Sequence, residues 1–184
     1  MRILITGTTG FVGHKLKASY TDAIAAPSLR NATQDMIKKI VEESEADVVI
    51  HTAAISDIGT CQKDPQSSYF ANVQIPLYLA AACKDRKLIC FSSDQVYSAC
   101  KEDGPYIEEV VKPGNIYAEH KLEMEERVLE LVPSAVMLRA EWMYDYVSPK
   151  PNYFLNVLHA SQQVSFSSRQ FRGITYLKEV VENM

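Results

Sequence analysis

Tyr117 and Lys121 stand four residues apart in the segment NIYAEHK, residues 115–121, which is typical of the start of a helix. Because a helix turns once in about 3.6 residues, side chains at positions i and i+4 lie on one face and can reach a common point. A phenol beside an ammonium group can act as a proton donor whose acidity is tuned by the cation. The same spacing also fits an exposed amphipathic face, so the pattern alone leaves both interpretations open.

Three glycines follow the apolar run RILIT at residues 2–6 and open a helical pattern. In such a position the first glycine permits a tight turn, the second lets the backbone approach a pyrophosphate, and the third lets the helix pack closely. The helix N-terminus offers free amide groups to negative charge. A turn that only needs positive φ angles is the alternative. The candidate dinucleotide-binding residues of this segment are Gly7, Thr9, Gly10, Phe11, Val12 and Gly13.

The residues after the second expected strand indicate which nicotinamide dinucleotide would bind. An acidic residue there binds the ribose 2′-hydroxyl, whereas an arginine accommodates a 2′-phosphate. Residues 26–30 read APSLR and contain no acid, so Ser28 and Arg30 favour NADPH, with NADH still open. The other interpretation of Arg30 is a solvated loop residue.

Ser92, Ser93 and Asp94 follow the apolar run LICF at residues 88–91, which predicts a strand. Ligands of open α/β sheets bind beyond the carboxyl ends of the strands, so polar groups there are suited to contact a substrate. A strand-end serine can also cap local backbone, which is the alternative for Ser93.

Alternating strands and helices must position these groups. We expect strands at 2–6, 22–26, 47–54, 87–93 and 134–140, with helices within 7–20, 31–46, 64–84 and 115–132. This alternation predicts an α/β fold, a doubly wound parallel sheet of the Rossmann type. We expect residues 1–145 to form the dinucleotide-binding domain. Residues 146–184, with helical patterns at 153–163 and 174–184, would begin a partial substrate-binding lobe.

Length and composition narrow the class of protein. The 184 residues are 47% hydrophobic and 23% charged, which fits one ordinary globular core. A formal net charge of −4 argues against nucleic acid as a partner. No stretch approaches the roughly 20 apolar residues that span a bilayer. The four cysteines have no metal-ligand spacing, so we expect reduced thiols and no metal. The run MRILITG at the start lacks the length and cleavage site of a signal peptide, so with no spanning segment we expect no membrane contact and a cytoplasmic location.

Five segments occur in an order that carries a family resemblance: TGTTGFVG, DVVIHTAA, FSSDQVY, NIYAEHK and LRAEW. They resemble the extended short-chain dehydrogenase/reductases, and most of all the dTDP-4-dehydrorhamnose reductase group. The resemblance implies NADPH-dependent reduction of a nucleotide-activated 4-keto-6-deoxy sugar. It implies that Ser93 holds the substrate carbonyl and that Tyr117 is the acid and also contacts the cofactor. It further implies that Lys121 binds the nicotinamide ribose and lowers the tyrosine pKa.

Further residues take roles from the same resemblance. Ala53 and Ala54 would line the cofactor, and Asp94 and Trp142 would face the sugar, although Trp142 fits core packing equally well. We interpret His51 as a strand-end histidine and not as a catalytic group.

The chain also departs from the group. Ala118 follows the tyrosine where glycine is frequent, and Ser98 and Ala99 replace a glycine near the VY corner. Members of the group continue into a further strand and most of the substrate lobe, so we expect this lobe to be incomplete. Two alternatives follow: a non-catalytic dinucleotide-binding module that regulates a partner enzyme, and an epimerase or dehydratase. The sequence leaves the oligomeric state open, including a homodimer.

Overall fold

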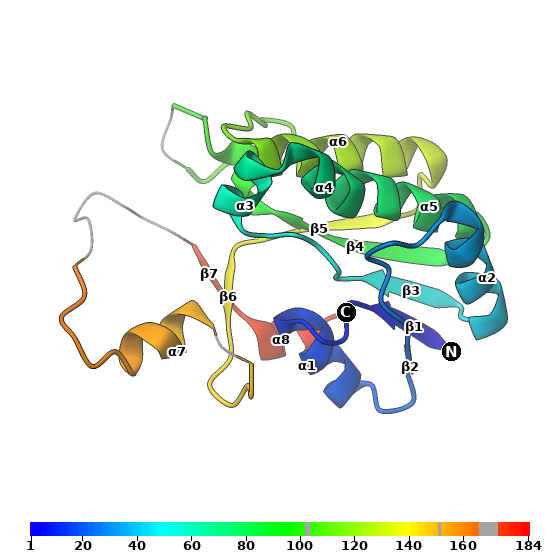
Figure 1. Cartoon of the computed structure of the whole chain (residues 1–184), viewed down its shortest axis with the longest axis horizontal. Helices are drawn as coiled ribbons and strands as arrows, with labels where there is room; N and C mark the ends of the chain where they lie inside the picture. The colour runs from blue at the N-terminus through cyan, green and yellow to red at the C-terminus, as the bar shows by residue number, and fades with distance from the viewer. Residues whose placement is uncertain (102–103, 151, 166–172) are drawn as a thin grey trace.

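The main sheet has five parallel strands in the order β2, β1, β3, β4, β5 (Figure 1). The computed structural model describes residues 1–101, 104–150, 152–165 and 173–184. The order runs outward in both directions from the β1–β3 pair, the place where doubly wound sheets bind ligands. The predicted α/β Rossmann fold is confirmed. The strands are β1 (Ile3–Thr6), β2 (Ile24–Ala25), β3 (Val48–His51), β4 (Lys87–Ser93) and β5 (Val136–Ala140).

Helices cover both faces of this sheet, and each face has its own apolar core (Figure 1). Leu4 and Val49 belong to one core, while Ile5 and Ile50 belong to the other, because successive strand residues point to opposite faces. The first core is covered by α2 (Gln34–Ser44), α5 (Ile75–Ala82) and α6 (Ile116–Leu131), and the second by α1 (Phe11–Ser19) and α8 (Leu177–Glu182).

The connection from β3 to β4 differs from the single helix predicted over 64–84. It contains α3 (Ile58–Lys63), α4 (Pro65–Tyr69), a π-helical turn η1 (Phe70–Gln74) and then α5. Asp64 accepts a hydrogen bond from Ser67 N at 3.0 Å and caps α4, as the sequence predicts. Pro76 near the start of α5 has no N–H to donate to residue 72, and Ile75 N donates to Phe70 O instead, which accounts for the wider turn.

A second, smaller sheet follows the main one. β6 (Trp142–Tyr144) pairs in parallel with β7 (Ile174–Tyr176), so the prediction of a helix over all of 174–184 is wrong for its first three residues. The stretch Ile-Thr-Tyr favours a strand, and the ring of Tyr176 stacks on Tyr144 with centroids 5.2 Å apart. α7 (Tyr153–Leu158) ends earlier than predicted, and residues 159–165, which follow it, are exposed.

The end of the chain packs against the helix that follows the glycine segment. Leu177 and Val181 of α8 lie in the second core, and Tyr20 OH donates a hydrogen bond to Val181 O at 2.8 Å. Lys15 of α1 forms an ion pair with the buried Asp145, with Nζ and Oδ2 2.8 Å apart. The domain boundary after residue 145 stays a prediction, and residues 151 and 166–172 of the predicted lobe lie outside the described residues. None of the described helices is long and apolar enough to cross a membrane.

Candidate active site

The glycine segment forms a turn that tolerates no side chain at two positions. Gly7 has φ +72°, and a Cβ atom there would lie 2.7 Å from Ala53 N. A Cβ atom at Gly13 would lie 2.3 Å from Gly7 O, which shows how closely α1 packs against the end of β1. Gly10 is the N-cap of α1, and its amide donates to Gly7 O at 2.9 Å. The segment therefore combines a left-handed turn with a helix whose N-cap has no side chain, as expected of a pyrophosphate cradle.

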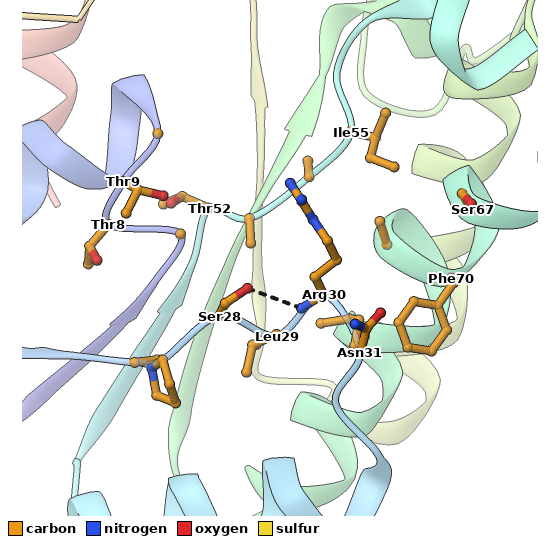
Figure 2. A pocket seen from close by; sticks show the side chains of 18 of the residues that line it. Thr8, Thr9, Ser28, Leu29, Arg30, Asn31, Thr52, Ile55, Ser67 and Phe70 are labelled. Atoms are coloured by element: carbon orange, nitrogen blue, oxygen red, sulfur yellow. Dashed lines mark hydrogen bonds between the residues drawn. The ribbon is translucent and has the colours of Figure 1, made fainter. Parts of the chain in front are cut away.

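A cavity of about 1000 Å³ opens beside this turn, at the carboxyl ends of β1, β2 and β3 (Figure 2). Its lining includes seven of the predicted cofactor residues: Gly7, Thr9, Gly10, Ser28, Arg30, Ala53 and Ala54. A volume of this size suits a nucleotide-sized ligand. The cavity lies at the switch point of the sheet, where the strand order reverses.

Arg30 brings a positive charge to the cavity. Figure 2 shows its side chain extending from the loop after β2 across the cavity, and its backbone amide donates a long hydrogen bond of 3.5 Å to Ser28 Oγ. Both residues lie on the loop 26–31, all of which lines the cavity. The arrangement places a cation and a hydroxyl where a second anionic group of a ligand could bind.

Five predicted cofactor residues are not part of this lining in the described structure: Phe11, Val12, Gly13, Tyr117 and Lys121. Phe11 and Val12 point into the second core, because α1 uses its apolar side chains to cover the sheet. Gly13 acts through packing and not through an exposed surface. The lining also includes side chains that the sequence pattern does not identify, from the loop after β3, from α3 and from α4 to α5: Thr52, Ile55, Thr60, Gln66, Ser67, Phe70, Ala71 and Ile75.

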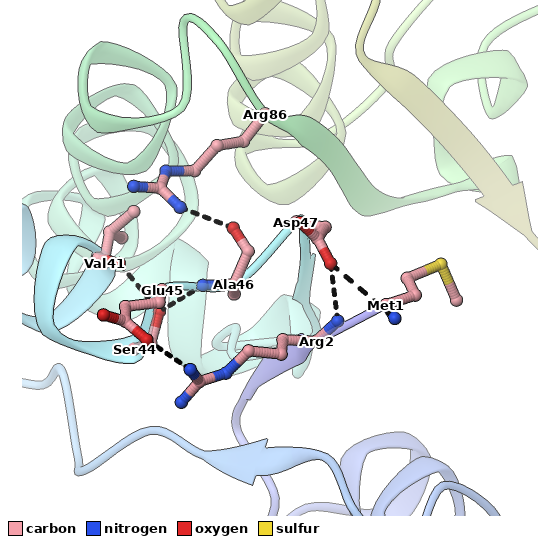
Figure 3. Close-up of polar contacts among 8 residues, drawn as sticks. All are labelled: Met1, Arg2, Val41, Ser44, Glu45, Ala46, Asp47 and Arg86. Carbon is pink, nitrogen blue, oxygen red and sulfur yellow. Dashed lines mark hydrogen bonds and ion pairs between the residues drawn. The ribbon is translucent and has the colours of Figure 1, made fainter.

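The charged residues at the opposite end of the strands, where the strands begin, pair with one another and with the backbone (Figure 3). Arg2 pairs with Glu45, and its amide donates to Asp47 Oδ2 at 2.7 Å. Arg86 donates to Ala46 O at 2.6 Å. These contacts join chain segments at the amino ends of β1, β3 and β4 and satisfy local backbone groups, so we interpret them as structural.

Tyr117 and Ser93 meet where α6 begins and β4 ends. Asn115 caps α6 by accepting a hydrogen bond from Ala118 N at 2.9 Å, which fixes Tyr117 in the first turn. Ser93 caps a short 3-10 turn, η2 (Asp94–Tyr97), and accepts from Gln95 N at 3.2 Å. Burial raises the pKa of Tyr117 to about 12, while a hydrogen bond with Ser93 opposes that rise. The phenol is therefore protonated at neutral pH.

Lys121 lies one helical turn beyond Tyr117 and is buried, with its Nζ donating to Phe91 O at 2.5 Å. Burial lowers the pKa of Lys121 to about 8, against the opposing influence of Cys90 and Glu125. The expectation that the tyrosine pKa is lowered is wrong for this structure. Burial of the phenol raises its pKa by more than the hydrogen bond with Ser93 lowers it. The Lys121 ammonium group is held by the backbone carbonyl of Phe91.

The remaining candidates lie close to these groups or farther along the chain. Asp94 Oδ1 accepts a hydrogen bond from Ser93 Oγ at 3.1 Å. His51 is buried, with Nδ1 2.7 Å from Thr6 Oγ1, and burial lowers its pKa to about 3, so the ring is neutral. Trp142 packs on the ring of Tyr153 with centroids 4.3 Å apart and is not among the residues described as lining the cavity.

Two groups of residues thus occupy one edge of the sheet. The glycine-side cavity can hold a phosphate-containing ligand, and the buried group of Ser93, Tyr117 and Lys121 can donate a proton. In the described part of the chain these last three residues do not line that cavity. No group of three or more His, Cys, Asp or Glu side chains among the described residues is placed to hold a metal ion.

Comparisons with known proteins agree with this geometry. The sequence matches the RmlD substrate binding domain family over residues 1–184. A dTDP-4-dehydrorhamnose reductase of Mycolicibacterium smegmatis is 33% identical over 152 residues, which cover 78% of this chain and 46% of that protein. One from Aggregatibacter actinomycetemcomitans is 29% identical over 153 residues, covering 78% of this chain and 52% of that protein. The chain spans about half the length of these curated relatives.

Solved structures share the fold. A crystal structure of dTDP-4-dehydrorhamnose reductase from Bacillus anthracis in complex with NADP matches with a TM-score of 0.85 at 22% identity, covering 99% of this chain and 68% of that one. A UDP-glucose 4-epimerase of Thermotoga maritima with UDP-glucose matches with a TM-score of 0.83 at 18% identity, covering 99% and 71%. Because this fold serves both a reductase and an epimerase, the reaction must be argued from the site.

Proposed function

Because the chain belongs to the RmlD substrate binding domain family, we propose that it takes part in the reduction of a nucleotide-activated 4-keto-6-deoxy sugar by a nicotinamide dinucleotide. The observation that carries the proposal is the placement of Tyr117 in the first turn of α6 beside Ser93 at the end of β4, with Lys121 buried one helical turn away. Relatives named dTDP-4-dehydrorhamnose reductase support the sugar-nucleotide substrate class.

The cavity residues fit a dinucleotide. A Cβ atom would obstruct the turn at Gly7 and Gly13, so the backbone there is shaped for close approach and not for side-chain packing. Gly7, Thr9 and Gly10 would hold the pyrophosphate, and Ala53 and Ala54 leave room beside it. When bound, the nicotinamide supplies the hydride.

We further propose that the dinucleotide is NADPH. Arg30 and Ser28 line the cavity on a loop without an acidic residue, and a guanidinium group is suited to bind a 2′-phosphate. Asp or Glu at this position would favour the unphosphorylated ribose instead. The comparison of dissociation constants for NADPH and NADH tests this preference.

The chain's own residues would supply the proton. Tyr117 is protonated at neutral pH and its hydroxyl would protonate the carbonyl oxygen as the carbon is reduced. The Ser93 hydroxyl, next to it, would hold the same oxygen and orient the carbonyl. Lys121 would bring a positive charge close to the developing negative charge. Asp94 and Trp142 remain proposed substrate contacts.

A second candidate function is a dinucleotide-binding module without turnover. The observation that favours it is the separation of the two groups, since the described lining of the cavity omits Ser93, Tyr117, Lys121 and Trp142. Such a module would bind NADPH and act on a partner enzyme, and it would not need Tyr117 as a proton donor.

One experiment separates the two functions. NADPH binding is followed by nicotinamide fluorescence, and turnover by the loss of absorbance at the reduced nicotinamide band with a dTDP-4-keto-6-deoxy sugar. We expect Tyr117→Phe to abolish turnover and to keep NADPH binding within about twofold, since the phenol hydroxyl makes a transition-state contact. Tyr20→Phe, which removes a hydroxyl at the C-cap of α1, is the control and should keep both. NADPH binding by the unmodified chain without turnover would support the module.

A further inference from the structure

α6 presents a third buried polar residue after Tyr117 and Lys121. Glu125 follows at the next i+4 position, so the three side chains share one buried stripe of the helix. Glu125 is only 4% exposed, although the proposed proton transfer gives it no role. A buried carboxylate is costly unless it is paired and hydrogen-bonded, so its partner indicates what it does.

That partner is Arg139 of β5. Its Nε lies 3.0 Å from both carboxylate oxygens of Glu125, and its Nη2 lies 2.6 Å from Oε2. The guanidinium thereby joins the middle of α6 to the outermost strand of the main sheet. Two parallel hydrogen bonds fix the orientation of both groups as well as their separation.

The same guanidinium reaches the turn that Ser93 begins. Arg139 Nη1 donates to Tyr97 OH at 2.6 Å and to Glu108 O at 2.6 Å. Tyr97 is the last residue of η2, the turn that Ser93 caps by accepting a hydrogen bond from Gln95 N. The ring of Tyr97 also stacks on Tyr106, with centroids 5.1 Å apart. One side chain therefore contacts the helix of Tyr117, the turn of Ser93 and the loop between them.

We propose that Arg139 and Glu125 are positioning residues, which hold the helix of Tyr117 and Lys121 in register with the turn of Ser93. This inference rests on the proposed reductase function. Ser93 and Tyr117 come from different elements and must share one carbonyl oxygen, so a displacement of about 1 Å between those elements would lower the rate by about 100-fold. Two side chains hydrogen-bond to both elements in the described part of the chain: Asn115, at the first turn of α6, and Arg139, which alone of the two carries a charge and reaches the middle of the helix.

The electrostatic consequence concerns Lys121. The titratable groups that influence this ammonium are Cys90 of β4 and Glu125 of its own helix, and Lys121 in turn acts on His51 of β3. Glu125 is the carboxylate of this set and favours the protonated form of Lys121. Glu125→Gln would remove that charge and leave the positive charge of Arg139 uncompensated, so both changes act against a proton on Lys121.

A titration of Lys121 tests this directly and needs no substrate. The Cε resonance of Lys121 is followed against pH by NMR in chain labelled at lysine, in the unmodified protein and in Glu125→Gln. We expect the pKa of Lys121 to fall by about one unit in the variant, since a removed neighbouring charge shifts a pKa by roughly 1–3 units. Glu123→Gln is the matched control, because Glu123 lies on the same helix and pairs with Arg127. A shift in Glu125→Gln no larger than in the control overturns the electrostatic part.

Tyr97→Phe tests the positioning part and leaves the Arg139–Glu125 pair in place. It removes one charge-assisted hydrogen bond, so we expect amide hydrogen exchange at Gln95, which is bonded to Ser93 Oγ, to quicken about tenfold. Tyr20→Phe is the control. Unchanged exchange at Gln95 in Tyr97→Phe overturns the link between Arg139 and the Ser93 turn. This holds even where Glu125→Gln fails to fold, because Tyr97→Phe tests the link by itself.

Kinetics complete the test. We expect Arg139→Gln to lower kcat by about 100-fold with little change in the KM for NADPH, and Arg139→Lys to recover only part of the rate, because lysine cannot form the bidentate pair. Equal losses in kcat and in NADPH binding would overturn the positioning role. Absence of turnover in the unmodified protein would refute the reductase proposal, whereas the titration and exchange results would still decide the arrangement around Arg139.

Discussion

Lys121→Met should change the pH dependence of stability by an amount that follows from the buried ammonium. The pKa of Lys121 is lowered from 10.5 to about 8 by burial, so the folded chain holds this proton less tightly than the unfolded chain. Below pH 8 both states are protonated and the folded state bears the full penalty. As the pH rises from 8 to 10.5 the folded state is already neutral while the unfolded state still binds the proton, so the stability of the natural chain increases.

The size of the effect follows from the two pKa values. At pH 7 the penalty is about 3 kcal/mol, and at pH 10.5 about 0.4 kcal/mol, at 1.36 kcal/mol per pKa unit. Lys121→Met removes this term, but it also removes the hydrogen bond to Phe91 O, which costs about 1–3 kcal/mol at every pH. The sign of the stability difference at pH 7 is therefore not decisive. The decisive quantity is its change of about 3 kcal/mol between pH 7 and pH 10.5.

Urea unfolding measured at several pH values, for the natural chain and for Lys121→Met, gives this quantity. The difference between the two proteins cancels the contributions of the other titrating groups to the free energy of unfolding. These groups include Tyr117, which begins to ionise near pH 10 in the unfolded chain. Lys39→Met is the control, since Lys39 lies on an exposed face of α2. A difference that stays constant within about 0.5 kcal/mol over this range would refute the assignment of a buried, easily deprotonated Lys121.

Three further substitutions test the cavity and the helix start. Arg30→Ala should weaken NADPH binding by about 10–100-fold and NADH binding by less than about twofold in fluorescence titrations, as a charged hydrogen bond is worth about 1.5–3 kcal/mol; Arg2→Ala, at the opposite edge, should change neither. Gly13→Ala should lower the free energy of unfolding by about 1–3 kcal/mol, because the new Cβ would meet the Gly7 backbone, whereas Gly59→Ala meets only ordinary contacts and should not destabilise. Asn115→Ala should cost about 1 kcal/mol in urea unfolding through loss of the helix cap, and the result would contradict the capping role if stability were unchanged.

Local sequence signals predict the main sheet well, because each strand and helix of the Rossmann part has its own periodicity or cap. Asp64 before Pro65, the glycines after RILIT and the alternation of apolar runs all act within a few residues. The small sheet of β6 and β7 is different. Its strands are some thirty residues apart in the chain and three residues long each, so only their pairing identifies them.

The residues of the candidate site also fall into those that a local sequence pattern predicts and those that only the fold brings together. Ser28, Arg30, Ala53 and Ala54 follow strands directly, and the parallel order of the strands brings them to one edge. Gln66, Ser67 and Phe70 reach the cavity from α4 and the π-helical turn, and no local pattern distinguishes their cavity-facing side. The tyrosine pKa could not be predicted from spacing, because it depends on how deeply packing buries the phenol.

The distribution of buried polar groups bears on the choice between a reductase and a binding module. A dinucleotide cavity can be built from glycines, small residues and one arginine, and the described lining contains those elements without Tyr117 or Lys121. Lys121 instead lies in a site that penalises its charge at neutral pH, as a buried cation held by one carbonyl. An apolar side chain of similar length would fill that space without the penalty. A titratable lysine buried one helical turn from a protonated tyrosine that lies beside a serine therefore supports the proposed proton transfer over the binding module.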